Sequence, residues 1–210
     1  INAFALGAQM TNPRAQIELK WACVEGFPQT ELLADGIRIV STQNASSELN
    51  ACSTNGTYLI NDTGEMIPLG THIWNWGEFY EYAIKEILSG GMKKEKNSPM
   101  ALNYWLGLDS GVIGMDISAR LPQGVRQMAN LLYVAVKRGY IDPFGRKIVA
   151  QDGSIKNDGT ILFSPEQILR MDWLCENVIG RIPVPGEIWP ECYKVMQEIG
   201  IYRDTFSIAE

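Results

Sequence analysis

A strict alternation of apolar and polar residues over residues 16–23 constrains the fold of this chain more than any other feature of its sequence. The apolar side chains occupy every second position: Ile17, Leu19, Trp21 and Cys23. This is the period of a strand with one buried face. Residues 1–11 before it have helical spacing and end at Asn12-Pro13, because proline disfavours helix in the residue before it. The chain therefore begins as a helix followed by a strand.

The same order of elements continues through the first third of the chain. Residues 37–40 and 57–60 are apolar and β-branched, and residues 46–52 between them suit a short helix. Strands that alternate with helices are typical of a parallel sheet, since a parallel connection has to cross back over the sheet. We therefore predict an α/β fold with a parallel sheet.

The remaining helices and strands are predicted from the capping and turn residues at their ends. An amphipathic helix is predicted over residues 76–91 and another from Pro122 to Gly139, with strands broken by a turn at 109–111 between them. A short β segment with two Asp-Gly turns follows over residues 147–163. Ser164 then begins a capping box for a helix that reaches Gly180, and a last helix is predicted over residues 188–199.

Charge and composition exclude several functions. The chain of 210 residues has 18 Lys and Arg against 24 Asp and Glu, a net charge of −6, so it lacks the basic surface that nucleic-acid binding needs. No apolar run reaches the ~18 residues of a transmembrane helix. Four scattered cysteines and a single histidine form no metal-ligand pattern, and no nucleophile or phosphate-loop motif is present. We expect no catalytic residue, no metal and no cofactor.

The most informative cluster is Trp74-Asn75-Trp76, at a predicted strand-to-helix junction. Two indole rings beside an amide suit a planar heterocycle, because the rings offer flat apolar faces and the amide offers a donor and an acceptor. The alternative is that both tryptophans are packed in a core. The sequence does not choose between these two interpretations.

Four segments, taken in order, resemble the BMP family, the basic membrane lipoprotein or purine-nucleoside receptor group of ABC-transporter solute-binding proteins. The segments are residues 1–15, 74–80, 151–153 and 171–183. The resemblance implies a type I periplasmic-binding-protein fold, in which two doubly wound α/β lobes close over a ligand. Ile1 would then lie inside the first helix of the second lobe, and most of the first lobe would be missing from this chain.

The resemblance also implies a division of the chain. Residues 1–73 would form second-lobe βα units, and residues 74–101 a crossing segment and a helix that belongs to the first lobe. Residues 102–147 would form the third crossing and a second-lobe helix, and residues 148–210 a C-terminal extension of a short β segment and two helices.

Some of the family's binding positions can be placed on this sequence. An acidic position that contacts ribose hydroxyls matches Asp62, preceded by Asn61. A lysine of nucleoside-binding members is replaced by Trp74, with Asn75 and Trp76 after it, and that departure weakens the case for a nucleoside ligand. Asn44 follows a predicted strand, where open α/β sheets place their ligands. The alternative for Asn44 is a helix N-cap.

The resemblance implies a binding protein and not an enzyme. Its ligand would be a small molecule such as a nucleoside or related heterocycle, and its partners the membrane subunits of an ABC transporter. It would be extracytoplasmic and held at the cell membrane as a lipoprotein. The alternative function is a ligand-sensing domain of a larger regulatory protein, which would be cytoplasmic. With one lobe missing, the apolar face of helix 76–91 would be uncovered, so a homodimer or a domain swap is expected.

Overall fold

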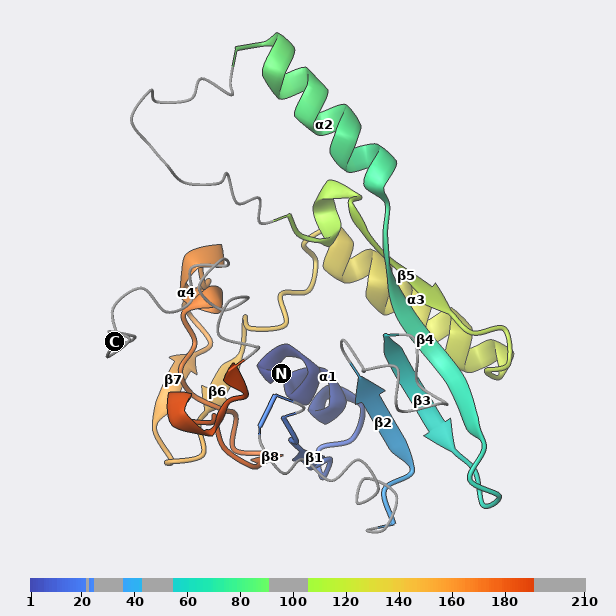
Figure 1. Cartoon of the computed structure of the whole chain (residues 1–210), viewed down its shortest axis with the longest axis vertical. Helices are drawn as coiled ribbons and strands as arrows, with labels where there is room; N and C mark the ends of the chain where they lie inside the picture. The colour runs from blue at the N-terminus through green and yellow to red at the C-terminus, as the bar shows by residue number, and fades with distance from the viewer. Residues whose placement is uncertain (22, 25–35, 43–54, 91–105, 191–210) are drawn as a thin grey trace. The chain divides into compact units, whose positions relative to one another are not determined.

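The computed structural model describes residues 1–21, 23–24, 36–42, 55–90 and 106–190 (Figure 1). The chain forms two compact units. The first unit comprises Ile1–Pro28 and Asp142–Glu210, and the second comprises Gln29–Ile141. The first unit is thus assembled from the two ends of the chain, and the second from its middle. The boundaries that the resemblance implies, at residues 73, 101 and 147, remain predictions.

The first unit combines short strands with short helices. Helix α1 (Asn2–Thr11) leads to β1 (Ile17–Glu18), which pairs in parallel with β8 (Val178–Ile179). An antiparallel hairpin is formed by β6 (Lys147–Val149) and β7 (Ile155–Asp158). Helix α4 (Pro165–Leu169) and the 3-10 turn η3 (Pro185–Glu187) complete the described elements of this unit.

The core of the first unit joins α1 to the C-terminal segment. It consists of buried side chains from both ends of the chain: Ala5, Leu6, Phe144, Ile148, Leu174, Cys175 and Val178. Two buried asparagines connect the same segments by hydrogen bonds. Asn2 donates to the Trp173 carbonyl (2.9 Å) and accepts from the Cys175 amide (3.0 Å), and Asn177 donates to the Ala5 carbonyl (3.0 Å). These polar links fix the register between segments that are about 170 residues apart in the sequence.

The second unit contains a four-stranded sheet with the order β2-β3-β4-β5. Its strands are β2 (Ile39–Thr42), β3 (Gly56–Ile60), β4 (Met66–Trp74) and β5 (Ile113–Ile117), and every neighbouring pair is antiparallel. In β3 the buried residues alternate with half-buried ones, and Tyr58 and Ile60 are among them. The long strand β4 connects the turn after β3 to the helix that follows (Figure 1).

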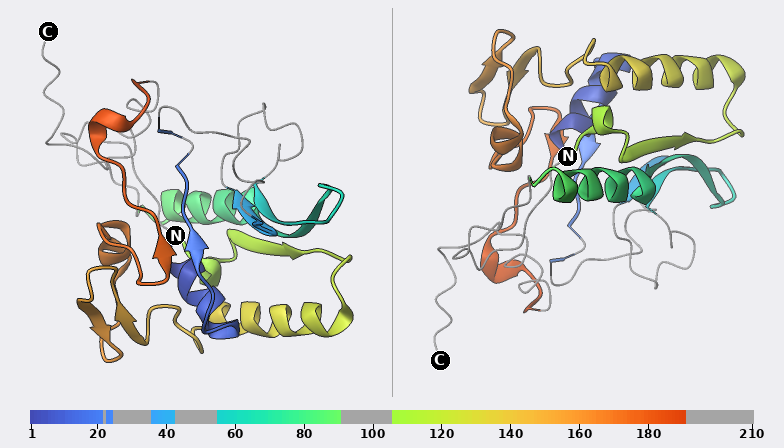
Figure 2. Two further views of the ribbon diagram at one scale, coloured as in Figure 1. Left: turned by 90° about the horizontal axis from the view of Figure 1, so that it is seen from below. Right: turned by 90° about the horizontal axis from the view of Figure 1, so that it is seen from above.

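Two helices accompany this sheet. Helix α2 (Trp76–Leu88) starts directly after β4, and α3 (Gln123–Lys137) runs alongside β5 (Figure 2). The 3-10 turn η2 (Leu108–Ser110) precedes β5. In the described structure none of the residues of α2 or α3 is buried. Both helices therefore leave apolar side chains exposed, including Ile84 and Ile87 on α2 and Met128 and Leu131 on α3.

Most predicted elements with a local end signal are confirmed, namely α1, α2, α3, the 109–111 turn and the Ser164 capping box. The expected strand over residues 16–23 is shorter, although its apolar positions are the more buried ones. The helix expected over 46–52 lies outside the described residues, as does most of the helix expected over 188–199. At the start of that second range Ile188 forms an antiparallel β-bridge with Val24 and is not helical.

Two predictions about elements are wrong. The parallel sheet expected for residues 37–60 is antiparallel, because β3 and β4 are joined by a tight turn and pair as a hairpin. The helix expected to reach Gly180 ends at Leu169, and Val178–Ile179 pair instead with β1. In that segment strand pairing and burial in the core stabilise an extended backbone more than the helical spacing of the apolar residues favours a helix.

Candidate functional site

Asn61 and Asp62 lie in the turn between β3 and β4. The Asn61 side-chain oxygen accepts hydrogen bonds from the amides of Thr63 (3.0 Å) and Glu65 (2.8 Å), and its amide donates to the Glu65 carboxylate (3.1 Å). This is how asparagine closes a turn on its own backbone. Asp62 pairs with the Arg38 guanidinium, and both side chains are mostly exposed. Such a surface pair contributes only about 0–1 kcal/mol, so the Asp62 carboxylate can exchange partners readily.

Asn75 holds the opposite end of β4. Its side-chain amide donates to the Gly111 carbonyl (2.8 Å), and its backbone N–H donates to the Val112 carbonyl (2.8 Å). The Asn75 carbonyl accepts the first amides of α2, from Glu78 (3.0 Å) and Phe79 (3.4 Å). Asn75 therefore ends the strand, starts the helix and fixes both to the residues that precede β5. One of the two N–H donors of its side-chain amide is thus used within the protein.

The two tryptophans beside Asn75 are exposed and stack on each other. The rings of Trp74 and Trp76 have centroids 5.7 Å apart and planes 18° apart, and Tyr80 stacks on Trp76 at 6.4 Å. His72 meets Trp74 edge-on at 6.2 Å. Trp74 is 49% and Trp76 54% exposed, so the core-packing interpretation is wrong for both. We call Trp74, Trp76 and Tyr80 the aromatic cluster.

The predicted site residues do not converge on one place. Asn61 and Asp62 precede β4, whereas Trp74, Asn75 and Trp76 stand at its far end. Nine residues of strand at about 3.3 Å per residue separate the two groups by roughly 30 Å. One small ligand cannot contact both groups in this arrangement. Asn44 lies outside the described residues.

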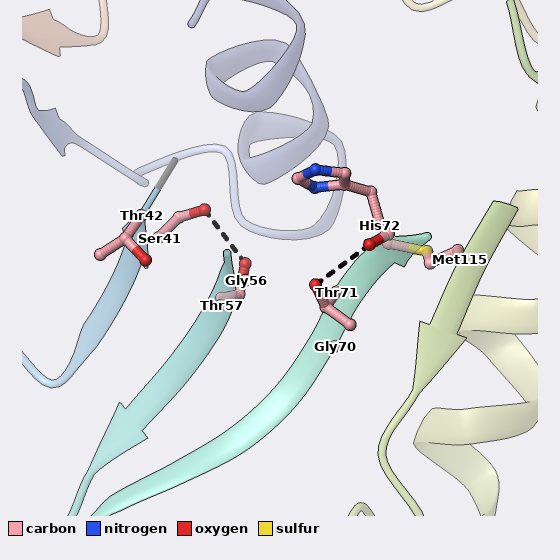
Figure 3. Close-up of a pocket in the computed structure, with 8 residues that line it drawn as sticks. All are labelled: Ser41, Thr42, Gly56, Thr57, Gly70, Thr71, His72 and Met115. Carbon is pink, nitrogen blue, oxygen red and sulfur yellow. Dashed lines mark hydrogen bonds between the residues drawn. The ribbon is translucent and has the colours of Figure 1, made fainter. Parts of the chain in front are cut away.

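A hollow on the sheet was not anticipated from the sequence. It has a volume of about 260 Å³ and is lined by residues of all four strands (Figure 3): Ser41, Thr42, Gly56, Thr57, Gly70, Thr71, His72 and Met115. The only local signal is that in three of the strands that line the hollow a small residue precedes a threonine, at positions 41–42, 56–57 and 70–71. Nothing in the sequence aligns these pairs, because the alignment depends on strand register.

Two glycines allow the strands to meet at the hollow. A Cβ atom on Gly56, which has a φ of 154°, would lie 3.0 Å from the Gly70 carbonyl oxygen and 3.3 Å from the Thr71 Cβ. A Cβ atom on Gly70 would lie 3.2 Å from the Asp116 carbonyl oxygen. Larger residues would push β3, β4 and β5 apart, so the two glycines hold the hollow in its shape.

Metal-ligating side chains are not grouped in the part of the chain that the structure describes. Within that part, no three His, Cys, Asp or Glu side chains are grouped closely enough to hold a metal ion. The described residues that line the hollow include no Asp, Glu, Lys or Arg. The chemistry available there is hydrogen bonding by hydroxyl and imidazole groups, together with stacking at the neighbouring aromatic cluster.

Comparison with known proteins identifies two relatives. The chain is 26% identical over 196 residues to a purine-binding protein of Brucella abortus. The aligned region covers 87% of this chain and 54% of that protein. It is also 26% identical over 132 residues to a protein of Haloferax volcanii that is provisionally named an ABC transporter glucose-binding protein. This aligned region covers 55% of this chain and 31% of that protein. No family model matches the chain.

Both relatives are named for binding a small molecule, and neither is named as an enzyme. The chain spans about half the length of the first relative and about a third of the second. Across the described residues, no helix has the length and apolar character needed to cross a bilayer.

Proposed function

We propose that this chain is the ligand-binding part of a solute-binding protein that serves an ABC uptake system. The similarity to a purine-binding protein over 87% of the chain supports this, as does the second relative, named for an ABC transporter. The ordered segments that resemble the BMP family support the same conclusion. The protein would be extracytoplasmic and anchored at the membrane as a lipoprotein, and its partners would be the membrane subunits of the transporter.

The ligand class we propose is a planar heterocycle such as a purine. The observation that carries the proposal is the exposed aromatic cluster at the junction of β4 and α2. Trp74 and Trp76 keep about half of their surface exposed, although indole rings of this size are usually largely buried. An aromatic ligand that stacks on these rings would remove both its own apolar face and theirs from water.

Asn75 would position the rings and not bind the ligand itself. Its side-chain amide donates one hydrogen bond to the Gly111 carbonyl, which sets the angle at which Trp74 leaves β4 and Trp76 enters α2. Specificity would then come from stacking and from hydrogen-bonding groups near the cluster. Asp62, Asn61 and Asn44 remain sequence-based predictions of ligand contacts.

The test is a binding titration of the 210-residue chain with adenine, hypoxanthine, adenosine and D-glucose. Binding is measured by tryptophan fluorescence and by calorimetry. Trp74→Ala and Trp76→Ala should each weaken purine binding. Stacking of a base on an aromatic side chain contributes about 1–3 kcal/mol, which corresponds to roughly 5- to 150-fold in affinity. Trp189→Ala is the matched control, because Trp189 is 44% exposed and belongs to the other unit.

Two results would contradict the proposal. The first is the absence of purine binding at millimolar ligand. The second is a loss of affinity in Trp189→Ala as large as in Trp74→Ala, since this would show a general effect of removing an indole. Asn75→Ala should also weaken binding without contacting the ligand, and a wild-type affinity in that variant would refute its positioning role.

A homodimer or a domain swap through α2 also remains a prediction. Tyr80, Ile84, Ile87 and Leu88 expose between 55% and 81% of their surface along this helix, and exposed apolar surface on this scale favours association. Size-exclusion chromatography with light scattering should give about twice the 23.4 kDa of the chain. A monomer across the micromolar range would contradict this prediction.

A further inference from the structure

The hollow on the β2-β3-β4-β5 sheet presents five residues on one face. In the strand register Ser41 pairs with Thr57, Thr57 with Gly70, and His72 with Met115. Residues that pair directly point to the same side of a sheet, and so do residues two apart in one strand, such as Gly70 and His72. The row across the face is therefore two hydroxyls, a glycine without a side chain, an imidazole and a thioether (Figure 3). The missing side chain at Gly70 makes the face concave.

The hydroxyl groups of this row have hydrogen-bonding capacity left over. The Ser41 and Thr57 hydroxyl oxygens are 3.1 Å apart and share one hydrogen bond. Two hydroxyls carry two hydrogens, so one hydrogen of the pair has no acceptor among the described residues.

The imidazole on the other side adds a further donor and acceptor. Within the described structure the His72 ring makes an edge-on contact with Trp74, and neither ring nitrogen takes part in a hydrogen bond. A neutral imidazole offers one donor and one acceptor. Met115, opposite His72, is 51% exposed and supplies an apolar surface. The hollow thus combines hydroxyl groups on one side and an imidazole on the other with an apolar patch.

This combination selects against charged ligands. A carboxylate or a phosphate needs Arg, Lys or a group of aimed backbone amides, and an ammonium group needs a carboxylate. The described lining contains none of these charged side chains. A sugar ring matches the lining, because its hydroxyls alternate between donor and acceptor roles and its C–H face is apolar. The volume of about 260 Å³ lies just below the roughly 300–1,000 Å³ of pockets for drug-sized ligands, which suits a single ring.

We propose that this hollow is a binding site for one neutral, polyhydroxylated ring, held by Ser41, Thr57 and His72 and packed on Met115. The ring can arrive as a free monosaccharide or as the sugar of a larger compound. His72 lines the hollow and contacts Trp74 of the aromatic cluster, so the two sites adjoin on β4. The proposal rests on the hollow alone and does not require that the aromatic cluster binds a heterocycle.

The experiment is calorimetric titration of the 210-residue chain with D-glucose and D-ribose, and in separate arms with adenosine and adenine. Glucose 6-phosphate serves as the charged comparison. The variants are Thr57→Val, which replaces a hydroxyl by a methyl group of similar size, and His72→Ala, which changes the other side of the hollow. Ser89→Ala is the matched control, because it removes an exposed hydroxyl that bonds to the Glu86 carbonyl at the end of α2.

The proposal predicts that a free sugar binds, that the phosphate ester binds more weakly, and that each variant lowers sugar affinity about five- to tenfold, as expected for one lost hydrogen bond. Ser89→Ala should match wild type. Circular dichroism and the thermal midpoint establish that each variant is folded. If Thr57→Val does not fold, His72→Ala carries the test by itself.

Several outcomes separate the two proposals. Binding of adenosine but of no free sugar supports the hollow if Thr57→Val weakens adenosine and leaves adenine unchanged. Equal weakening of adenosine and adenine would overturn it, as would the absence of both sugar and adenosine binding at tens of millimolar. If no free sugar binds, adenosine binding that is lost in Trp74→Ala but unaffected in Thr57→Val would support the aromatic cluster and overturn the hollow.

Discussion

Asn157 should be one of the most sensitive polar residues in the first unit. It lies in β7, is 1% exposed, and makes four hydrogen bonds to the backbone. Its amide donates to the carbonyls of Phe144 (2.9 Å) and Ile161 (2.7 Å), and its oxygen accepts from the amides of Gly159 (2.8 Å) and Ile161 (3.3 Å). One side chain therefore ties the turn after β7 to the segment that leads into β6.

The expected cost of Asn157→Ala follows from these four bonds. Each contributes about 0.5–1.5 kcal/mol net, and buried partners left without a bond bring the cost towards the upper end. The total is about 4 kcal/mol, which is a large share of the roughly 5–15 kcal/mol that stabilises a typical domain. At roughly 2–4 °C per kcal/mol for a chain of this size, the thermal midpoint should fall by about 8–16 °C.

The assay is thermal and urea unfolding followed by circular dichroism, with alkylation of the buried Cys175 thiol as a probe of the first unit. Asn12→Ala is the matched control. Asn12 is exposed and its side chain accepts one hydrogen bond, from the Arg14 amide (3.1 Å), so removing this side chain should cost no more than about 1 kcal/mol. A fall of less than about 3 °C in Asn157→Ala, or an equal fall in both variants, would refute the reasoning.

Three further predictions concern the same unit. Ser164→Ala should destabilise it by about 1 kcal/mol in urea unfolding, because it removes the N-cap of α4, and an unchanged midpoint would contradict that. The Arg181 side chain holds the pKa of Glu187 down to about 2, so its stabilisation is complete above the ordinary carboxyl pKa and is lost as pH falls towards 2. Glu187→Gln should flatten the acid side of a melting-temperature profile, and an unaltered profile would argue against the pair. Burial raises the pKa of Cys175 to about 11, so peptide mapping after mild alkylation at pH 8 should find the half-buried Cys23 modified before Cys175.

Local signals in the sequence were sufficient to predict the helices and turns whose ends are marked by capping or turn residues. The Ser164 capping box, the Asp-Gly turns and the alternation at Ile17 and Leu19 each depend on residues within a few positions of one another. Asp152 and Asp158 illustrate this, since each accepts hydrogen bonds from the residue two positions later, at Ser154 and Thr160. Such features form wherever the segment lies in the fold, so they can be predicted without knowing the tertiary contacts.

Residues 171–179 show where local reasoning fails. Leu174, Cys175 and Val178 are correctly predicted to be inward-facing, and all three are buried in the core. The spacing of these apolar residues suggested a helix. The backbone is extended instead, because Asn2 accepts a hydrogen bond from the Cys175 amide and Val178 pairs with Ile17. These partners are more than 160 residues away along the chain. A short apolar run has no preference strong enough to oppose them.

The two candidate sites differ in the same way. The aromatic cluster includes Trp74 and Trp76, which are adjacent to Asn75, so the sequence could identify them but could not decide whether they are buried. Their exposure depends on β4 ending at Trp74 and on the helix after it lacking a buried face in the described structure. The hollow has the opposite property. Its chemistry is unremarkable at each position, and it exists only because antiparallel register places Ser41 beside Thr57 and Thr57 beside Gly70. The expectation of a parallel sheet gave a different pairing of these strands, so it could not predict the hollow. Register matters because a one-residue change would turn these side chains to the other face.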